Sequence, residues 1–260
     1  MPNDRRSFVT NGLLGAGAIA LANTPAAKAE SRKNPSGVSG YDYQLPAFPK
    51  GTRFLFQGDS ITDMKWGRNQ KDRNHYLGHS YVYLIASRLG VDMPHAKLEF
   101  FNRGMSGHKV SDLKKRWQKD TIDLKPDILS ILIGVNDVGR GTPTAEWEST
   151  YRALLDETKK GLPKTRLVLM DPFVLRVTRL DNDTAWKRWR GEVDRQRAIV
   201  KQMAKDYSAV HIRTQDVFDA ASKDIAPSHW IWDGVHPLPE GHELIARNWL
   251  QTVSQQMRFD

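Results

Sequence analysis

The sequence predicts an α/β protein in which helices cover both faces of a mainly parallel β-sheet. The first observation is a series of short apolar segments, each of a length that suits a strand buried on both faces. The second is a set of amphipathic helical patterns that lie between these segments. Strands that alternate with helices imply right-handed crossover connections, so we expect a helix–sheet–helix sandwich.

Five apolar segments are the candidate strands. They are Arg53–Gln57, Leu98–Phe101, Ile128–Ile133, Leu167–Met170 and the weaker Ala209–Ile212. The candidate helices between and after them carry apolar residues three or four positions apart. They are Tyr81–Leu89, Val110–Trp117, Ala145–Lys160, Thr184–Tyr207 and a last helix that Pro239 opens. The alternation continues to the end of the chain, which favours one domain with a single sheet.

The first 29 residues have the features of an export signal. Arg5 and Arg6 precede a mildly apolar stretch, Leu13–Leu21, and Ala27–Ala29 has the A-x-A form of a cleavage site. The paired arginines resemble a twin-arginine signal, with the general secretory route as the alternative. The apolar stretch is too short for a permanent membrane span. We therefore expect a periplasmic or extracellular protein, without stable membrane insertion after the signal is removed.

The rest of the chain divides into a lead-in and one folded domain. Residues 30–50 are polar and contain three prolines, so we expect a linker or extended lead-in there, and the domain over residues 51–260. The chain has no cysteine, which excludes a thiol nucleophile, thiolate metal ligands and disulfides. Its formal net charge is +9, but no nucleic-acid-binding motif accompanies that charge, so we expect no nucleic-acid partner.

Residues capable of chemistry follow the candidate strands. The first strand leads into Gly58–Thr62, the second into Asn102–Gly107 and the third into Gly134–Asp137, while Trp232–Pro237 precedes the last helix. Ligands of such folds bind beyond the carboxyl ends of the strands. We therefore expect these four loops to meet at one edge of the sheet.

The loops contain the groups that ester cleavage needs. A serine hydroxyl becomes a strong nucleophile when a base removes its proton, and His236 can do this for Ser60. Asp233, three residues before His236, can hold the imidazole in one tautomer and stabilise its charged form. The tetrahedral intermediate needs fixed hydrogen-bond donors. The candidates are the backbone N–H groups of Ser60 and Gly104 and the side-chain amide of Asn136.

These residues resemble the SGNH hydrolase superfamily, whose members are also called GDSL-type esterases and lipases. The matching blocks, in chain order, are Gly58–Thr62, Gly104, Gly134–Asp137 and Asp233–His236. The likeness covers about residues 53–257, and four blocks in this order are far more specific than any one of them. The resemblance implies a flavodoxin-like α/β/α sandwich of about five parallel strands. It also implies the triad Ser60–His236–Asp233, an oxyanion hole from Ser60, Gly104 and Asn136, and neither a metal nor an organic cofactor.

The expected function is the removal of acetyl or other short acyl groups from a carbohydrate outside the cytoplasm. The export signal supports this, and Gly134–Asp137 and Trp232–Pro237 look similar to the corresponding segments of exported carbohydrate acetylesterases. A lysophospholipase, thioesterase or arylesterase of the same superfamily is an alternative, although no long apolar lid is evident. A non-catalytic glycan-binding protein is a further alternative, and it would be signalled by the loss of a triad residue.

Some aromatic and histidine residues remain open to two interpretations. Trp230 and Trp232 flank the base loop and are the candidate substrate contacts. Four other aromatic residues could line the pocket or pack in the core, and these are Trp66, Tyr76, Trp186 and Trp189. His75 and His79 have a helical metal-ligand spacing, but no third ligand is nearby, so we expect no metal site.

Overall fold

The computed structural model describes residues 48–257. The expected export signal and most of the expected lead-in therefore lie outside the described residues. Within residues 48–257 there is no helix with the length and apolar character needed to cross a membrane.

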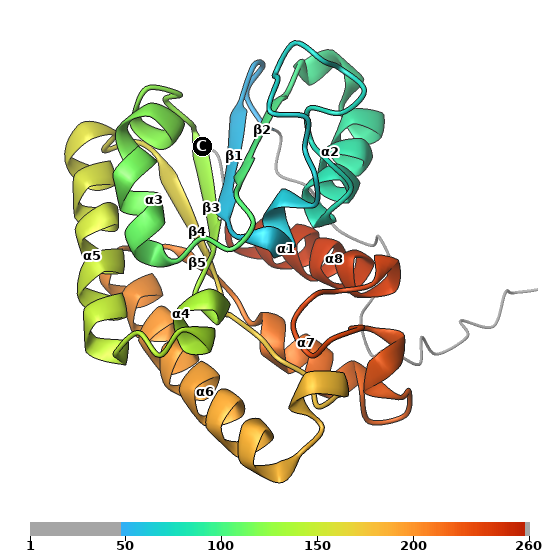
Figure 1. The fold of residues 1–260 in the computed structure, drawn as a ribbon. Coiled ribbons are helices and arrows are strands. Elements are labelled where there is room, and N and C mark those ends of the chain that lie inside the picture. Colours follow the sequence, from blue (N-terminus) through green and yellow to red (C-terminus); the bar gives the residue numbers. More distant parts are fainter. Residues whose placement is uncertain (1–47, 258–260) are drawn as a thin grey trace, which may run out of the picture. The chain divides into compact units, whose positions relative to one another are not determined.

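Five parallel strands form one sheet (Figure 1). They are β1 (Arg53–Gly58), β2 (Glu99–Gly104), β3 (Ile128–Leu132), β4 (Arg166–Met170) and β5 (Val210–Ile212). Their order is β2-β1-β3-β4-β5, which is the flavodoxin-like order. Each of the five apolar segments therefore forms a strand, and the predicted fold class is confirmed.

The helices lie in two layers, one on each face of the sheet (Figure 1). One layer contains α2 (Tyr81–Asp92), α7 (Thr214–Ala221) and α8 (Pro239–Gln256), and the other contains α3 (Val110–Trp117), α5 (Thr144–Gly161) and α6 (Asp183–Asp206). Two shorter helices, α1 (Ser60–Asp63) and α4 (Val135–Gly139), directly follow β1 and β3. Helical patterns predicted five of these eight elements. The helices α1 and α4 are too short for an amphipathic period to stand out, whereas α7 is as long as α3 and was not predicted.

The continuous apolar composition of the strands follows from this sandwich. In β1, Phe54 and Phe56 pack into the core under α2 and α8, whereas Leu55 between them packs into the core under α3 and α5. Side chains alternate between the faces of a strand, so a strand covered on both faces must be apolar at every position. The strands contain a few buried polar residues, and one of them, Ser130 in β3, accepts a hydrogen bond from Trp249 Nε1 at 3.0 Å.

The register of the three central strands brings the predicted loops to one level. Gly58 at the end of β1 pairs with Gly104 at the end of β2 and with Leu132 at the end of β3. The connections that carry Ser60, Gly107 and Asn136 therefore begin side by side at the carboxyl edge. This is also where the strand order reverses, between β1 and β3, and ligands of such sheets bind at that point.

Candidate active site

Ser60 is the first residue of the one-turn helix α1, directly after β1. Asp59 caps this helix, because its Oδ1 accepts a hydrogen bond from the N–H of Ile61 at 3.0 Å. The turn requires glycine at position 58, since a Cβ there would lie 2.6 Å from the carbonyl oxygen of Leu132 on the neighbouring strand. The tight turn presents the Ser60 hydroxyl at the edge of the sheet.

The loop before α8 holds Asp233 and His236 in one compact turn. The Oδ1 atom of Asp233 accepts hydrogen bonds from the N–H groups of Val235, at 3.0 Å, and His236, at 2.8 Å. The N–H of Trp232 donates to the carbonyl of His236 at 3.2 Å and closes the turn. Gly234, between them, has a φ of +95°, a conformation that glycine adopts without strain. This turn therefore accounts for the spacing of three residues between Asp233 and His236.

The fold joins these two segments, which are 176 positions apart, through a direct hydrogen bond. Ser60 Oγ lies 2.8 Å from His236 Nε2, and His236 Nδ1 lies 2.8 Å from Asp233 Oδ2. An ionised carboxylate accepts hydrogen bonds only, so the proton of the neutral imidazole is placed on Nδ1. Nε2 is then free to accept the proton of the serine hydroxyl, as a general base must.

The surroundings of Asp233 keep its carboxylate charged. Burial by itself would raise the pKa of Asp233, but hydrogen bonds from the His236 ring and from the backbone of His236 and Val235 outweigh burial and lower it to about 2. Arg179 Nη2 adds an ion pair to Asp233 Oδ2 at 3.2 Å. The carboxylate that faces the imidazole is therefore an anion throughout the mildly acid and neutral range.

The connection between β4 and α6 supports this base loop. The N–H of Leu175 donates to the carbonyl of Gly234 at 3.0 Å, and Thr178 Oγ1 donates to the carbonyl of Trp232 at 2.7 Å. Arg179 follows directly. Thr178 and Arg179 could not be recognised as site residues from the sequence, because this connection has no periodic pattern and matches none of the family blocks.

Asn136 lies in the first turn of α4, but only part of its amide is engaged. Asn136 Nδ2 donates one hydrogen bond, to the carbonyl of His108 at 3.1 Å. An amide nitrogen carries two hydrogens, so one remains available to a ligand. This bond also shows that the loop after β2 lies directly against the loop after β3.

Gly104 does not have the available N–H that the sequence analysis expected. Its N–H donates to Asn102 Oδ1 at 2.8 Å, so the donor already has a partner. Position 104 requires glycine for a different reason, since a Cβ there would lie 2.3 Å from the backbone nitrogen of Asp63 in α1. The expectation that Gly104 contributes to the oxyanion hole is therefore corrected: Gly104 allows α1 to pack closely against the end of β2.

Gly107, in the same loop, has the free donor. Its N–H makes no hydrogen bond within residues 48–257, and its φ is +79°. The preceding residue is tied to α1, because Asp63 Oδ2 accepts hydrogen bonds from Ser106 N, at 2.9 Å, and from Ser106 Oγ, at 2.6 Å. Asp63 in turn binds both terminal nitrogens of Arg68, at 2.7 and 2.6 Å. The Ser106–Gly107 segment is thus held beside the helix that begins with Ser60.

The two tryptophans of the base loop differ in exposure. Trp230 is 6% exposed, and its Nε1 donates to the carbonyl of Ala221 at 3.3 Å, so it belongs to the core. The expectation that Trp230 contacts substrate is therefore corrected. Trp232 is 59% exposed, and its ring centroid lies 6.3 Å from that of His236. It borders a mainly apolar cleft of about 470 Å³, whose other lining residues are Met64, His79, Leu84, Pro237, Leu238, Pro239 and His242.

The structure shows how the four other aromatic residues are buried. Trp66 is buried and donates from Nε1 to the carbonyl of Gly104 at 2.8 Å. Tyr76, Trp186 and Trp189 are partly buried and pack against the core. His75 is near Asp72 rather than His79, with 3.1 Å between Nδ1 and Oδ2. Among residues 48–257 no group of three or more His, Cys, Asp or Glu side chains is placed to hold a metal ion.

Comparisons with known proteins show the family of the chain. The model of the GDSL-like lipase/acylhydrolase family matches residues 56–244. The chain belongs to this family. The predicted resemblance is confirmed, and the protein is a carboxylic ester hydrolase.

Several relatives are esterases. An acetylxylan esterase from Geobacillus stearothermophilus is 35% identical over 217 residues, which are 78% of this chain and 94% of that protein. A multidomain esterase from Ruminococcus flavefaciens is 29% identical over 246 residues, which are 82% of this chain and 31% of that protein. A crystal structure of the Geobacillus enzyme matches with a TM-score of 0.69 at 33% identity, and covers 79% of this chain and 95% of the other. Catalytic mutants of that enzyme have been solved at a serine, at an aspartate and at the histidine three positions after the aspartate.

Proposed function

We propose that Ser60, His236 and Asp233 form the catalytic triad of this esterase, and that it removes acetyl or other short acyl groups from a carbohydrate. The observation that carries the proposal is the chain of two 2.8 Å contacts from Ser60 Oγ through the His236 ring to Asp233. The catalytic mutants of the Geobacillus enzyme support it, since that enzyme has an aspartate and a histidine at the same spacing.

The reaction proceeds in two steps, the acylation and the deacylation of Ser60. In the first, His236 Nε2 takes the hydroxyl proton while Ser60 Oγ bonds to the ester carbonyl carbon. The tetrahedral intermediate then expels the alcohol, which receives the proton from His236, and the acyl group stays on Ser60. In the second step His236 takes a proton from water, the resulting hydroxide attacks the acyl carbon, and the proton returns to Ser60 Oγ as the carboxylic acid leaves.

The oxyanion hole that we propose consists of three donors. The N–H of Ser60 lies at the start of α1 and donates to no acceptor within residues 48–257, and the same is true of the N–H of Gly107. The second hydrogen of Asn136 Nδ2 is the third donor. Fixed donors of this kind stabilise the charge that develops on the carbonyl oxygen. Gly107 thus replaces Gly104 in the expected set.

The cleft beside Trp232 is proposed as the subsite for the sugar. The exposed face of Trp232 is next to the His236 ring, and the remaining lining is mainly apolar. A pyranose ring has an apolar face of C–H groups that packs on an indole, while its hydroxyls stay in water. The acetylxylan esterase activity of the Geobacillus relative supports a carbohydrate substrate.

Export is part of the proposal as well. The A-x-A pattern at Ala27–Ala29 places signal cleavage before Glu30, with a periplasmic or extracellular location for the mature enzyme. Amino-terminal sequencing of the protein recovered from outside the cytoplasm should begin at Glu30. Recovery of the full chain in the cytoplasm only would contradict export without affecting the chemistry.

Acetate release from a panel of acetylated polysaccharides tests the substrate class, with Ser60→Ala as the inactive control. A p-nitrophenyl ester series tests the acyl group, and we expect acetate to be turned over faster than octanoate. Faster turnover of octanoate would favour the lysophospholipase or thioesterase alternative. Lack of activity on every ester would favour a glycan-binding protein.

A further inference from the structure

Arg140 lies beside the loop that carries the proposed oxyanion donor. It directly follows α4, and its N–H donates to the carbonyl of Asn136 at 3.1 Å. Its Nη2 atom lies 3.5 Å from the position that a Cβ on Gly107 would occupy. The guanidinium therefore lies next to Gly107.

Unlike Arg179 and Arg68, Arg140 has no counterion within residues 48–257. Arg179 forms an ion pair with Asp233, and Arg68 forms one with Asp63. The side chain of Arg140 is exposed and makes neither a hydrogen bond nor an ion pair within residues 48–257. A guanidinium presents a planar fork of N–H donors that matches a carboxylate in two parallel hydrogen bonds. An unpaired fork beside a binding site is therefore available to an anionic group of a ligand.

Two further arginines lie near the residue that precedes Arg140. A Cβ on Gly139 would lie 3.0 Å from the indole of Trp189, so that ring packs directly against the residue before Arg140. The guanidinium carbons of Arg179 and Arg188 each lie 5.7 Å from the Trp189 ring centroid. Two arginines thus lie beside one aromatic ring on this side of the site. Such an arrangement attracts anions, and the attraction weakens as salt is added.

We propose that Arg140 binds a carboxylate of the substrate, and that the preferred substrate is an acylated glycan with acidic sugar units. The inference rests on the proposed function, because it concerns the sugar that carries the ester. With a neutral glycan bound, the Arg140 guanidinium would donate its hydrogen bonds to water. A uronate next to the acylated sugar would pair with Arg140 while the ester carbonyl occupies the oxyanion hole.

The test compares three acetyl esters: acetylated oligosaccharides with and without a uronate unit, and p-nitrophenyl acetate. We expect Arg140→Gln to lower the ratio of kcat/KM for the acidic over the neutral oligosaccharide by about three- to tenfold, mainly through KM. Arg140→Lys should restore part of the ratio, because it keeps the charge and loses the fork. The wild-type ratio should also fall as salt is raised from low to high concentration.

Lys164→Gln is the matched control. It removes one exposed positive charge two residues before β4, at the opposite edge of the sheet from the site, and should leave the ratio unchanged. An unchanged ratio in Arg140→Gln, or an equal loss with all three esters, would overturn the inference. The equal loss would show that Arg140 acts on the oxyanion instead. Failure of the wild type to hydrolyse even p-nitrophenyl acetate would count against the proposed function.

Discussion

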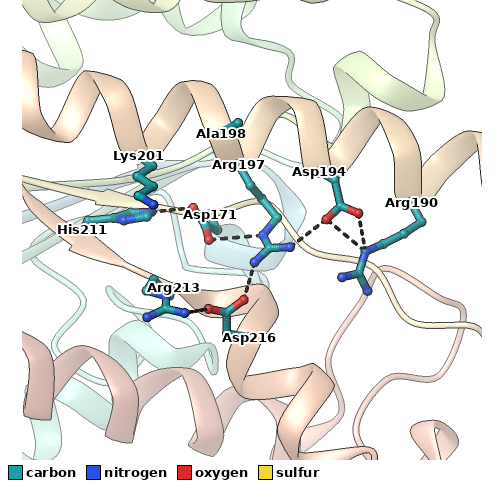
Figure 2. Close-up of a pocket in the computed structure, with 9 residues that line it drawn as sticks. All are labelled: Asp171, Arg190, Asp194, Arg197, Ala198, Lys201, His211, Arg213 and Asp216. Atoms are coloured by element: carbon teal, nitrogen blue, oxygen red, sulfur yellow. Dashed lines mark hydrogen bonds and ion pairs between the residues drawn. The ribbon is translucent and has the colours of Figure 1, made fainter.

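Two aspartate–histidine pairs with largely buried carboxylates lie within residues 48–257, and one of the two faces a serine. In the base loop, Asp233 Oδ2 and His236 Nδ1 are 2.8 Å apart. Beside β4 and β5, Asp171 Oδ1 and His211 Nε2 are 2.7 Å apart (Figure 2). Both carboxylates are largely buried, with 11% and 2% of their side chains exposed. By distance and burial alone, the second pair is as good a catalytic pair as the first.

The difference lies in what surrounds each pair. The second oxygen of Asp171 accepts from Arg197 Nε at 3.3 Å, and Arg197 also binds Asp194 and Asp216. Figure 2 shows how charges of opposite sign alternate around this pocket of about 490 Å³. Its lining contains no serine, threonine or cysteine that could act as a nucleophile. An aspartate–histidine hydrogen bond is therefore not sufficient for a hydrolase site, which also needs a nucleophile and hydrogen-bond donors without partners.

The largest expected effect is the difference in kcat between variants at the two aspartate–histidine pairs. Ser60→Ala removes the nucleophile and should lower kcat on p-nitrophenyl acetate by roughly 10⁴-fold or more. His211→Ala should change kcat by less than about twofold, because His211 has no serine to activate. The folded state of both variants is checked by thermal unfolding. Comparable losses of turnover in the two variants would show that the second pair contributes to catalysis.

The next prediction exchanges each aspartate for its amide. Asp233→Asn should lower kcat by roughly 10²- to 10⁴-fold, because an amide neither fixes the required tautomer nor stabilises the imidazolium. Asp171→Asn should leave kcat nearly unchanged and lower the free energy of unfolding by about 1–3 kcal/mol, because Arg197 loses a buried counter-charge. Steady-state kinetics and denaturant unfolding measure the two quantities. The reverse pattern would exchange the roles that we assign to the pairs.

The pH dependence of activity should follow His236 and not Asp233. The pKa of Asp233 is lowered to about 2, so the stability that its charge provides is present above about pH 4 and is lost as the pH falls toward 2. A general base must be unprotonated to accept the serine proton, so activity should rise from mildly acid to neutral pH without unfolding. A flat kcat/KM profile over this range would count against His236 as the base. His211→Ala should leave the profile unchanged.

The smallest expected effect concerns Asp59, a buried carboxyl that has neither a histidine nor an arginine as a partner. Burial raises its pKa to about 7, although the hydrogen bond from Ile61 N opposes this, and Oδ2 has no hydrogen-bond partner within residues 48–257. Between about pH 4 and 7 the folded state holds a proton that the unfolded state has released, so stability falls as the pH rises through this range.

Asp59→Asn keeps a cap for α1 and removes this titration. Relative to the wild type, the variant should gain about 1 kcal/mol or more, or about 2–4 °C in Tm, between pH 5 and pH 8. Asp63→Asn is the contrasting control. Burial would raise the pKa of Asp63, but Arg68 and Ser106 lower it, so this variant should lose stability at both pH values. A Tm difference for Asp59→Asn that does not change with pH would contradict the raised pKa of Asp59.

Several site residues could be predicted because their chemistry is local. Asp233 and His236 are three residues apart in one turn, and Ser60 and Asn136 directly follow apolar strands that any parallel sheet would align. The choice between Gly104 and Gly107 could not be made in this way. It depends on the Asn102 side chain, which folds back onto the N–H of Gly104, and on the Asp63 carboxylate, which fixes Ser106.

The roles of the tryptophans and arginines could not be predicted from the sequence either. Trp230 and Trp232 are two positions apart in an irregular loop, where no periodicity separates the buried side chain from the exposed one. Arg140 and Arg179 are two of many cationic residues in a chain of net charge +9. Only the tertiary structure shows that Arg179 pairs with Asp233 and that Arg140 remains unpaired beside Gly107.

The sequence by itself thus determined the α/β fold, the family and the proposed triad of Ser60, His236 and Asp233. Burial patterns and short-range spacing are properties of contiguous residues, so they can be recognised without a structure. The tertiary structure decided which donors stay free, which aromatic ring meets the solvent and which aspartate–histidine pair faces a serine. Those properties depend on hydrogen bonds and packing between segments that are far apart in the chain, and the spacing of residues along the chain does not specify them.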